Sequence, residues 1–408
     1  MKVLIIGGGA SGMMAALSAL ENPENTVTLL ERQARVGKKL LATGNGRCNL
    51  TNRNIRLSHY HGAQPEFARF ALESFYVGRT LAFFERLGLL TVTEDSGKVY
   101  PLSDQASSVL DVLRFALAAQ GANVVTSCDI VEVKHKARGY EALAATGETY
   151  FGDKLILACG GAAGKKLGGS RSGYHLLSQL KHSCTELYPS LTQIKTDPTF
   201  VKSLKGVRAD AHVRLRKDGK TVQDSFGEVQ FTDFGLSGPE AFTLSRAAAT
   251  GGEGQELALD FFREYGESVL LDMLQEKREK LPALTAEELF AGMLQSRLGR
   301  MIVKRAGLKY QTPLKDLSDE QLLSCVKIGK WFTLAVDGVM GFDSAQVTAG
   351  GVSTREFDPR TLESTVKPGL FACGEVLDID GDCGGFNLQW AWSSGCVAGK
   401  LGKREDEV

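Results

Sequence analysis

The stretch that decides the fold class stands at residues 2–12 and reads KVLIIGGGASG. Its first five residues form a short, mostly β-branched apolar run, typical of a strand buried on both faces of a parallel sheet. Gly7, Gly9 and Gly12 follow with G-x-G-x-x-G spacing, and residues 13–20 (MMAALSAL) are predicted to form the helix that they open. This spacing assigns a tight turn to Gly7, close approach of the backbone to a pyrophosphate to Gly9, and helix-to-strand packing to Gly12.

A second strand and an acidic residue complete a dinucleotide-binding unit. Residues 26–30 (TVTLL) predict the strand, and Glu31 stands at its end, within the ~20-residue interval expected for the acid that binds a ribose hydroxyl. A Gly-rich turn without a ligand is the alternative interpretation of the glycines alone. We predict a site for FAD or NAD and not for NADP, because a carboxylate here disfavours a 2′-phosphate.

The loop at residues 41–52 (LATGNGRCNLTN) distinguishes between these two cofactors. Gly44 and Gly46 would let the backbone lie against a large flat ligand. Hydrogen-bonding side chains stand at nearly every other position, at Thr43, Asn45, Arg47 and Asn49. An isoalloxazine ring with its ribitol presents acceptors along one edge, so we predict FAD. A structural loop whose Asn side chains cap their own backbone is the alternative.

A second Gly-rich loop near the carboxyl end is predicted to form the opposite wall of the cofactor site. Residues 366–375 (VKPGLFACGE) predict a turn and a short strand that ends in Gly374 and Glu375. Residues 380–391 (DGDCGGFNLQWA) predict a loop that opens a helix running through Gly399. Free N–H groups at this helix start would face the flavin pyrimidine, where negative charge collects on reduction.

Two further strands are expected to complete the cofactor domain. Residues 154–161 (KLILACGG) predict a buried strand with a Gly-Gly end. Residues 122–133 (ANVVTSCDIVEV) alternate as one strand, whose backbone could contact the adenine.

Composition indicates the number of domains and argues against nucleic-acid-binding, membrane-spanning and metal-binding proteins. The chain has 408 residues, which predicts two or three domains. Lys plus Arg and Asp plus Glu both total 48, and this balance argues against a nucleic-acid partner. No segment approaches the roughly 20 apolar residues of a membrane span, and no leader is recognised, so we expect a cytoplasmic protein. The eight cysteines show no C-x-x-C spacing, so we predict reduced thiols and no metal site.

Together these motifs resemble the BaiN-like family of flavoproteins, also called aminoacetone-oxidase-like NAD(P)/FAD-dependent oxidoreductases. The resemblance covers essentially the whole chain and rests on IIGGGASGMMAA, LLATGNGRCNLTN, VYPLSDQASSVLDVL, FTDFGLSGPE, VTAGGV and GEVLDIDGDCGGFNLQWAWSSG. It implies an α/β fold in which a discontinuous Rossmann-like FAD-binding domain carries an inserted β-barrel-like domain and a helical domain.

The domain boundaries follow from this resemblance and from local patterns. We predict an FAD domain at residues 1–190 and 345–408, a β-rich domain at 191–262, and a helical domain with a return linker at 263–344. Asp218-Gly219 signals a hairpin, and Thr285 with Glu288 forms a capping box. One helix face is expected to carry Leu270, Leu271, Leu274 and Leu281. Residues 403–408 (KREDEV) are expected to fray.

The predicted site has a long list of cofactor contacts and a short list of catalytic candidates. We predict that FAD is held non-covalently by Gly7, Gly9, Ala10, Ser11, Gly12, Glu31, Arg32, Lys39, Thr43, Gly44, Asn45, Gly46, Arg47, Asn49, Ile130, Cys159, Gly160, Gly161, Gly374, Glu375, Asp378, Gly385, Phe386, Asn387, Leu388 and Gln389. The catalytic candidates are Arg47 as an electrostatic clamp, Asn387 beside the ring, and Tyr100 as a proton donor. Their structural alternatives are a fork to carbonyls, a helix cap and a core residue, respectively.

The resemblance implies hydride transfer through flavin N5 to reduce a conjugated C=C bond of a hydrophobic, bile-acid-like or other enone substrate. No second complete strand, G-x-G-x-x-G and helix unit is present, so NADH or NADPH is expected only as a transient donor. The first alternative is an oxidase that takes hydride from a small amine or amino ketone and passes electrons to dioxygen. The second is a flavin-bound sensor or a tRNA-associated protein. Oligomeric state and nicotinamide preference are left open.

Overall fold

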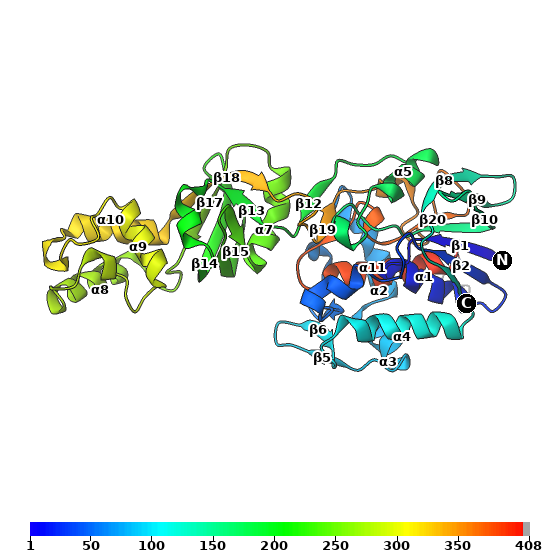
Figure 1. The fold of residues 1–408 in the computed structure, drawn as a ribbon, viewed down its shortest axis with the longest axis horizontal. Helices are drawn as coiled ribbons and strands as arrows, with labels where there is room; N and C mark the ends of the chain where they lie inside the picture. Colours follow the sequence, from blue (N-terminus) through cyan, green and yellow to red (C-terminus); the bar gives the residue numbers. More distant parts are fainter. Residues whose placement is uncertain (403–408) are drawn as a thin grey trace. The chain divides into compact units, whose positions relative to one another are not determined.

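The computed structural model describes residues 1–402, so the predicted frayed end at residues 403–408 lies outside the described residues. The chain divides into two compact units (Figure 1). Unit 1 comprises Met1–Tyr188 together with the chain from Gln346 onwards, and unit 2 comprises Pro189–Ala345.

A five-stranded parallel sheet forms the centre of unit 1. Its order is β20-β11-β1-β2-β7, so the strand from the late part of the chain closes one edge. The strands are β1 (Lys2–Ile6), β2 (Thr26–Leu30), β7 (Asn123–Val125), β11 (Lys154–Leu157) and β20 (Leu370–Ala372). The central strands are apolar because helices cover both faces of such a sheet. Four of the five residues of β1 are buried.

Helices from opposite ends of the chain pack together in unit 1. α1 (Ala10–Leu20) begins three residues earlier than the helix predicted at residue 13. It contacts α11 (Phe386–Gly399), and the two lie side by side in Figure 1. A Cβ on Gly395 or Gly399 would lie 2.5 Å from a carbonyl oxygen of α1. Glycine at these two positions therefore allows the close packing. The other longer helices are α2 (Arg69–Ser74), α3 (Val77–Arg86), α4 (Ala106–Ala119) and α5 (Ser172–Gln179).

The strand predicted at residues 122–133 is wrong as a single element. The segment forms β7 in the parallel sheet and then β8 (Ile130–His135), which pairs with β9 (Tyr140–Ala144) and β10 (Thr149–Gly152) in a separate antiparallel sheet. Ser127 has a left-handed φ of 55°, and the Cys128 N–H donates to the Glu31 carbonyl. These two features turn the chain out of the first sheet.

Short strands surround the candidate site. β6 (Lys98–Pro101) pairs with β3 (Thr51–Asn52) and β5 (Thr91–Thr93). β4 (Tyr60–His61) pairs antiparallel with β21 (Asp380–Gly381), which joins an early and a late segment of the chain.

Unit 2 contains a closed barrel in the order β13-β16-β15-β14-β17-β18. The strands are β13 (Ile194–Thr196), β14 (Arg208–Lys217), β15 (Lys220–Phe231), β16 (Gly235–Ser237), β17 (Gln255–Asp260) and β18 (Phe332–Val339), and α7 (Pro239–Thr250) follows β16. The predicted hairpin is present: Asp218 and Gly219 connect β14 to β15 with φ of 50° and 76°. Two positive φ angles match the twist of the paired strands.

The helices of unit 2 share one buried apolar cluster with the barrel. They are α8 (Glu267–Lys280), α9 (Ser296–Arg305) and α10 (Asp319–Lys330). Leu270 and Leu274 are buried as predicted, whereas Leu281 is 48% exposed because α8 ends at the preceding residue. The predicted capping box of Thr285 and Glu288 is confirmed. Within residues 1–402, no helix combines the length and the apolar character needed to cross a membrane.

Candidate functional site

The turn after β1 has the geometry that a dinucleotide requires. Gly7 has a φ of 112°, and a Cβ on Gly12 would lie 1.8 Å from the Gly7 carbonyl oxygen. A Cβ on Gly9, in contrast, would meet no atom within 4 Å. Gly7 and Gly12 are therefore required by the protein itself, and Gly9 leaves one side of the turn open.

The start of α1 offers unused hydrogen-bond donors. No acceptor within residues 1–402 receives the N–H groups of Gly9, Ala10, Ser11 or Gly12, and the helical pattern begins with Met13 N–H donating to the Gly9 carbonyl at 3.0 Å. Free N–H groups at a helix start carry partial positive charge and bind phosphate. This end of α1 thus suits a pyrophosphate.

Glu31 holds the same turn from the end of β2. Its Oε2 accepts from the Gly8 N–H at 2.7 Å and its Oε1 from the Gln33 N–H at 2.6 Å. A carboxylate has about four acceptor positions, so both oxygens can still accept from ribose hydroxyls.

Glu375 connects three of the predicted segments. Its Oε2 pairs with the Lys39 Nζ at 2.8 Å, and its Oε1 accepts from the Thr348 N–H at 2.9 Å. A Cβ on Gly161 would lie 2.4 Å from that same Oε1. A Cβ on Gly374, likewise, would lie 2.4 Å from the Ser11 Oγ. Residues predicted separately from distant parts of the chain are therefore neighbours.

The early loop is built from left-handed residues. A 3₁₀ segment at Leu40–Gly46 is interrupted by Gly44 and Asn45, both with φ of 56°, and is followed by Cys48 with φ of 62°. The Thr43 hydroxyl donates to the Leu40 carbonyl at 2.7 Å and holds the first turn. A Cβ on Gly46 would meet no atom within 4 Å. This loop therefore keeps an open side where a flat ligand can approach.

The early and late loops lie directly against each other. Asn52 Nδ2 donates to the Gly384 carbonyl at 2.9 Å, Thr51 Oγ1 donates to Gln389 Oε1 at 2.6 Å, and Trp392 Nε1 donates to the Leu50 carbonyl at 2.9 Å. The partners are separated by 332 to 342 residues. The structure thus brings together the two loops that we predict to enclose one cofactor.

A buried amide marks the place where the loops meet. Asn49 is 9% exposed, and its Oδ1 has no hydrogen-bond partner among the described residues. A Cβ on Gly385, which precedes α11 with φ of 96°, would lie 2.9 Å from that oxygen. An unpaired buried amide oxygen needs a donor, and the N–H of an isoalloxazine ring is one. Together with the free N–H groups of α1, this orphaned oxygen fits FAD.

Two of the three catalytic candidates contact each other. The Arg47 guanidinium stacks on the Tyr100 ring at 3.9 Å from its centroid and forms ion pairs with Glu94 at 3.0 Å and Asp104 at 2.5 Å. Tyr100 is 8% exposed, and burial raises the pKa of its phenol, which stays protonated. Arg47 is therefore already committed to two carboxylates, and its clamp role remains a prediction.

The side-chain amides of Asn387 and Gln389 form hydrogen bonds within the protein. Asn387 Nδ2 donates to the Gly381 carbonyl at 2.7 Å, and its Oδ1 accepts from the Gly381 N–H at 2.8 Å. Gln389 is fully buried, and its Nε2 donates to Phe75, Thr80 and Ser393. These side chains shape the late loop, and the backbone at the start of α11 is left to face a ligand.

The remaining predicted FAD contacts all lie in unit 1, and they differ in burial and in hydrogen-bond partners. Arg32 donates to the Gly168 carbonyl at 2.9 Å, and the Asp378 carboxylate accepts from the Ala63 N–H at 3.1 Å. Ile130 is 4% exposed on β8. Cys159 and Gly160 follow β11, and Phe386 and Leu388 stand in the first turn of α11.

The sequence predictions missed a cluster beside the late loop. Asp382 contacts His59 and His61, with distances of 3.0 Å to His59 Nδ1 and 2.7 Å to His61 Nε2. The His-Tyr-His pattern at residues 59–61 was the available signal in the sequence, although His59 ends a 3₁₀ turn and only His61 lies in β4. Its acidic partner, more than 320 residues away, was not visible in the sequence.

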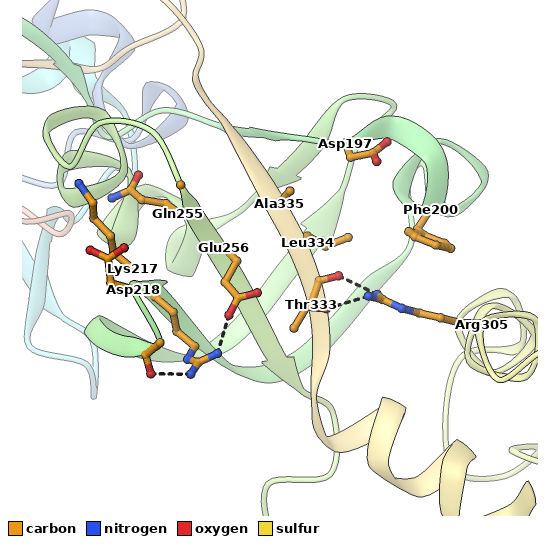
Figure 2. A pocket seen from close by; sticks show the side chains of 13 residues that line it. Asp197, Phe200, Lys217, Asp218, Gln255, Glu256, Arg305, Thr333, Leu334 and Ala335 are labelled. Atoms are coloured by element: carbon orange, nitrogen blue, oxygen red, sulfur yellow. Dashed lines mark hydrogen bonds and ion pairs between the residues drawn. The ribbon is translucent and has the colours of Figure 1, made fainter.

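Unit 2 holds a separate cavity of about 590 Å³ (Figure 2). Charged residues of both signs line it. Arg305 donates to the Thr333 carbonyl and hydroxyl, both at 2.7 Å, and its guanidinium lies against the rings of Phe200 and Phe332. Arg216 is paired with Glu256 at 2.5 Å. None of the predicted FAD contacts lines this cavity.

Comparison with known proteins gives three consistent matches. The family model described as HI0933-like protein Rossmann domain matches residues 1–401. A Clostridium scindens 3-dehydro-bile acid delta(4,6)-reductase is 39% identical over 98% of both chains. An Escherichia coli ribosomal RNA dihydrouridine synthase is 27% identical over 96% of this chain and 95% of the relative.

Solved structures are similar at lower identity. A 3-ketosteroid-Δ4-(5α)-dehydrogenase from Rhodococcus jostii RHA1 is 14% identical, with a TM-score of 0.48 over 97% of this chain and 95% of the other.

Proposed function

The chain belongs to the HI0933-like family, and on that premise we propose that this FAD-dependent oxidoreductase reduces a carbon–carbon double bond conjugated to a carbonyl. The electron donor in this proposal is NADH or NADPH. The substrate is a hydrophobic enone of the bile-acid type.

One observation carries the proposal: the 39% identity to a 3-dehydro-bile acid delta(4,6)-reductase over nearly the full length of both chains. The more distant Escherichia coli relative is named for making dihydrouridine. Dihydrouridine differs from uridine by two hydrogens across a double bond conjugated to a carbonyl. The two names therefore describe different molecules and the same type of bond change.

The chain's own residues have distinct tasks in this proposal. When bound, FAD supplies reversible hydride transfer. The N–H groups of residues 9–12 bind its pyrophosphate, Glu31 accepts from its ribose, and Asn49 with the start of α11 binds its ring. Tyr100, kept protonated by burial, is available to donate a hydrogen bond toward a substrate carbonyl.

A uridine within ribosomal RNA is the second candidate substrate, because of the Escherichia coli relative. The formal net charge of zero counts against it, since RNA binding gains most of its affinity from neutralising phosphates. The amine or amino ketone oxidase is the third candidate, and neither of the two relatives described above carries such a name.

The test is an anaerobic spectroscopic titration of the purified yellow protein. NADH and NADPH are added separately, and the loss of flavin absorbance is followed. A 3-dehydro bile acid with a Δ4 double bond is then added, and in a parallel sample its saturated counterpart. We expect bleaching that reverses only with the unsaturated acid, with one saturated product formed per flavin.

Other outcomes are equally clear. Reoxidation by an unmodified ribosomal RNA fragment, and not by the enone, would move the function to the second candidate. Failure of both nucleotides to bleach the flavin, combined with rapid bleaching by a small amine and reoxidation by dioxygen, would establish the oxidase.

A further inference from the structure

One titratable cluster in unit 1 has no task in the function proposed above. β4 carries His61, and His59 ends the 3₁₀ turn at Leu57–His59 just before it. Because β4 pairs with β21, the backbone N–H of Asp382 reaches the His59 carbonyl at 3.0 Å. The Asp382 carboxylate then lies between the two imidazoles, 3.0 Å from His59 Nδ1 and 2.7 Å from His61 Nε2.

The cluster is tied to the first turn of α11. The His59 ring stacks on the Phe386 ring with centroids 4.3 Å apart and an interplanar angle of 26°. Asn387 Nδ2 donates to the Asp382 carbonyl at 3.2 Å and so holds the backbone that carries the carboxylate. The same turn carries the N–H groups assigned to the flavin ring, so the cluster stands next to that part of the site.

The charge of Asp382 is preserved despite its surroundings. Burial opposes its ionisation, but the hydrogen bonds from His61 and His59 outweigh burial and hold the pKa of the carboxyl below its ordinary value. The adjacent Tyr60 phenol donates to the Phe386 carbonyl, and burial raises its pKa well above the ordinary value, so it stays neutral. A carboxylate hydrogen-bonded to an imidazole fixes the tautomer and the orientation of the ring.

The two histidines differ in which nitrogen remains available. His59 gives Nδ1 to the carboxylate, and its Nε2, at the outer end of the ring, forms no hydrogen bond within residues 1–402. Its side chain is 31% exposed. His61 uses its outer nitrogen for the carboxylate, so only the nitrogen next to its backbone is left. Of the two imidazoles, His59 is therefore the one whose outer nitrogen is left to donate.

We propose that His59 Nε2 delivers the proton that completes double-bond reduction, with Asp382 and His61 as positioning residues. This inference rests on the function proposed above. Hydride, with the two electrons supplied by the nicotinamide donor, adds to the carbon distant from the carbonyl, and the π electrons form an enolate. The His59 N–H bond then breaks, and its proton forms the new C–H bond beside the carbonyl. Water returns a proton to the imidazole.

Four variants test this assignment. His59→Gln removes the proton donor, Asp382→Asn removes the carboxylate, and His61→Gln removes its second partner. His175→Gln is the matched control, because His175 is an exposed histidine of the same unit whose imidazole lies 3.2 Å from the Gln179 amide nitrogen and contacts no carboxylate among the described residues. FAD affinity and the unfolding temperature are measured first. We expect all four variants to keep FAD affinity within twofold of wild type and His175→Gln to unfold within about 2 °C of it. Asp382→Asn should unfold at a lower temperature, because it loses the stabilising carboxylate.

Two kinetic readouts isolate the proton step. The first is anaerobic reoxidation of the bleached protein by the unsaturated acid, compared with the bleaching rate by NADH or NADPH. The second is uptake of deuterium from D₂O beside the carbonyl of the saturated acid, with no nicotinamide present. General acid catalysis contributes about 10²–10⁴-fold, so we expect His59→Gln to slow both by at least about 100-fold with bleaching unchanged. Asp382→Asn should act in the same direction, and His175→Gln should change neither.

A glycine variant guards against a folding artefact. His59→Gly leaves space for a free imidazole, and we expect added imidazole to restore reoxidation in His59→Gly and to have no effect on His175→Gln, which already reoxidises at the wild-type rate. Unchanged reoxidation and deuterium uptake in His59→Gln with FAD bound would overturn the proton role and leave the proposed function standing. A wild-type protein that bleaches and never reduces the unsaturated acid would overturn both.

Discussion

Substitution of two glycines in the turn after β1 separates what the fold needs from what the cofactor needs. In Gly12→Ala the new Cβ would lie 1.8 Å from the Gly7 carbonyl oxygen, whereas ordinary contacts of this kind exceed about 3.4 Å. Both partners are backbone, so α1 must move away from β1 by more than about 1 Å. Overpacking of this kind costs about 1–3 kcal/mol, and we expect the upper end of that range.

The matched variant is Gly9→Ala, where the new methyl group meets no protein atom within 4 Å. The Gly9 backbone has φ −81° and ψ −170°, which alanine adopts without strain. The free energy of unfolding should therefore change by less than about 0.5 kcal/mol. FAD affinity should fall at least about tenfold, which corresponds to 1.4 kcal/mol, because the methyl group occupies the side of the turn assigned to the pyrophosphate.

Thermal unfolding of the apoprotein and equilibrium titration with FAD measure the two effects separately. A loss of about 3 kcal/mol lowers the unfolding temperature by about 6–12 °C for a domain of this size, and only Gly12→Ala should show it. Gly9→Val enlarges the same group and should abolish FAD binding. A Gly9→Ala or Gly9→Val protein that keeps its full yellow colour and wild-type affinity would refute the assignment of this turn to the cofactor.

Three further outcomes follow from single side chains. Gln389→Ala should lower the free energy of unfolding by about 2–3 kcal/mol in urea titrations, because it leaves the Thr51 hydroxyl without its acceptor and removes a buried donor from Phe75, Thr80 and Ser393; a loss under about 1 kcal/mol would contradict this. Because the folded-state pKa of Asp382 is lowered, its ionised form stabilises the fold above the unfolded value of about 3.9, and this contribution is lost as pH falls through the folded pKa. The stability gap between wild type and Asp382→Asn should thus shrink from about pH 5 to about pH 3, and a gap that widens on acidification would reverse the sign argued here. Burial raises the pKa of the Cys48 thiol to about 12, so mass spectrometry should find it unmodified by iodoacetamide while exposed Cys184 reacts.

Local patterns predicted the parts of this fold that depend on neighbouring residues. The β-branched run at residues 2–6, the glycine spacing that follows, and Glu31 at the end of the second strand all appear where the sequence places them. The same holds for the Asp218-Gly219 hairpin and the Thr285 capping box. In each case the deciding interactions join residues that are close in the sequence, so they do not depend on contacts with distant parts of the chain.

Predictions that extended a local pattern too far failed at specific residues. Residues 122–133 alternate well enough for one strand, but the left-handed Ser127 and the bond from Cys128 to Glu31 divide the segment between two sheets. Leu281 follows the apolar period of α8, yet the helix ends at the residue before it. Apolar periodicity indicates which side chains could share one face of a helix or strand. It does not indicate the residue at which that helix or strand ends.

The sequence alone therefore determined the class of cofactor and the identity of the two loops that we predict to bind it, because glycine spacing and donor-rich composition are local chemical requirements. Only the tertiary structure decided which side chains are free to act. Pairing of β4 with β21 brings His59 and His61 to Asp382, more than 320 residues away, and packing of α11 turns the Gln389 amide into the core. Such contacts arise when strands and helices from opposite ends of the chain bury their apolar faces together, and no single segment specifies its partner.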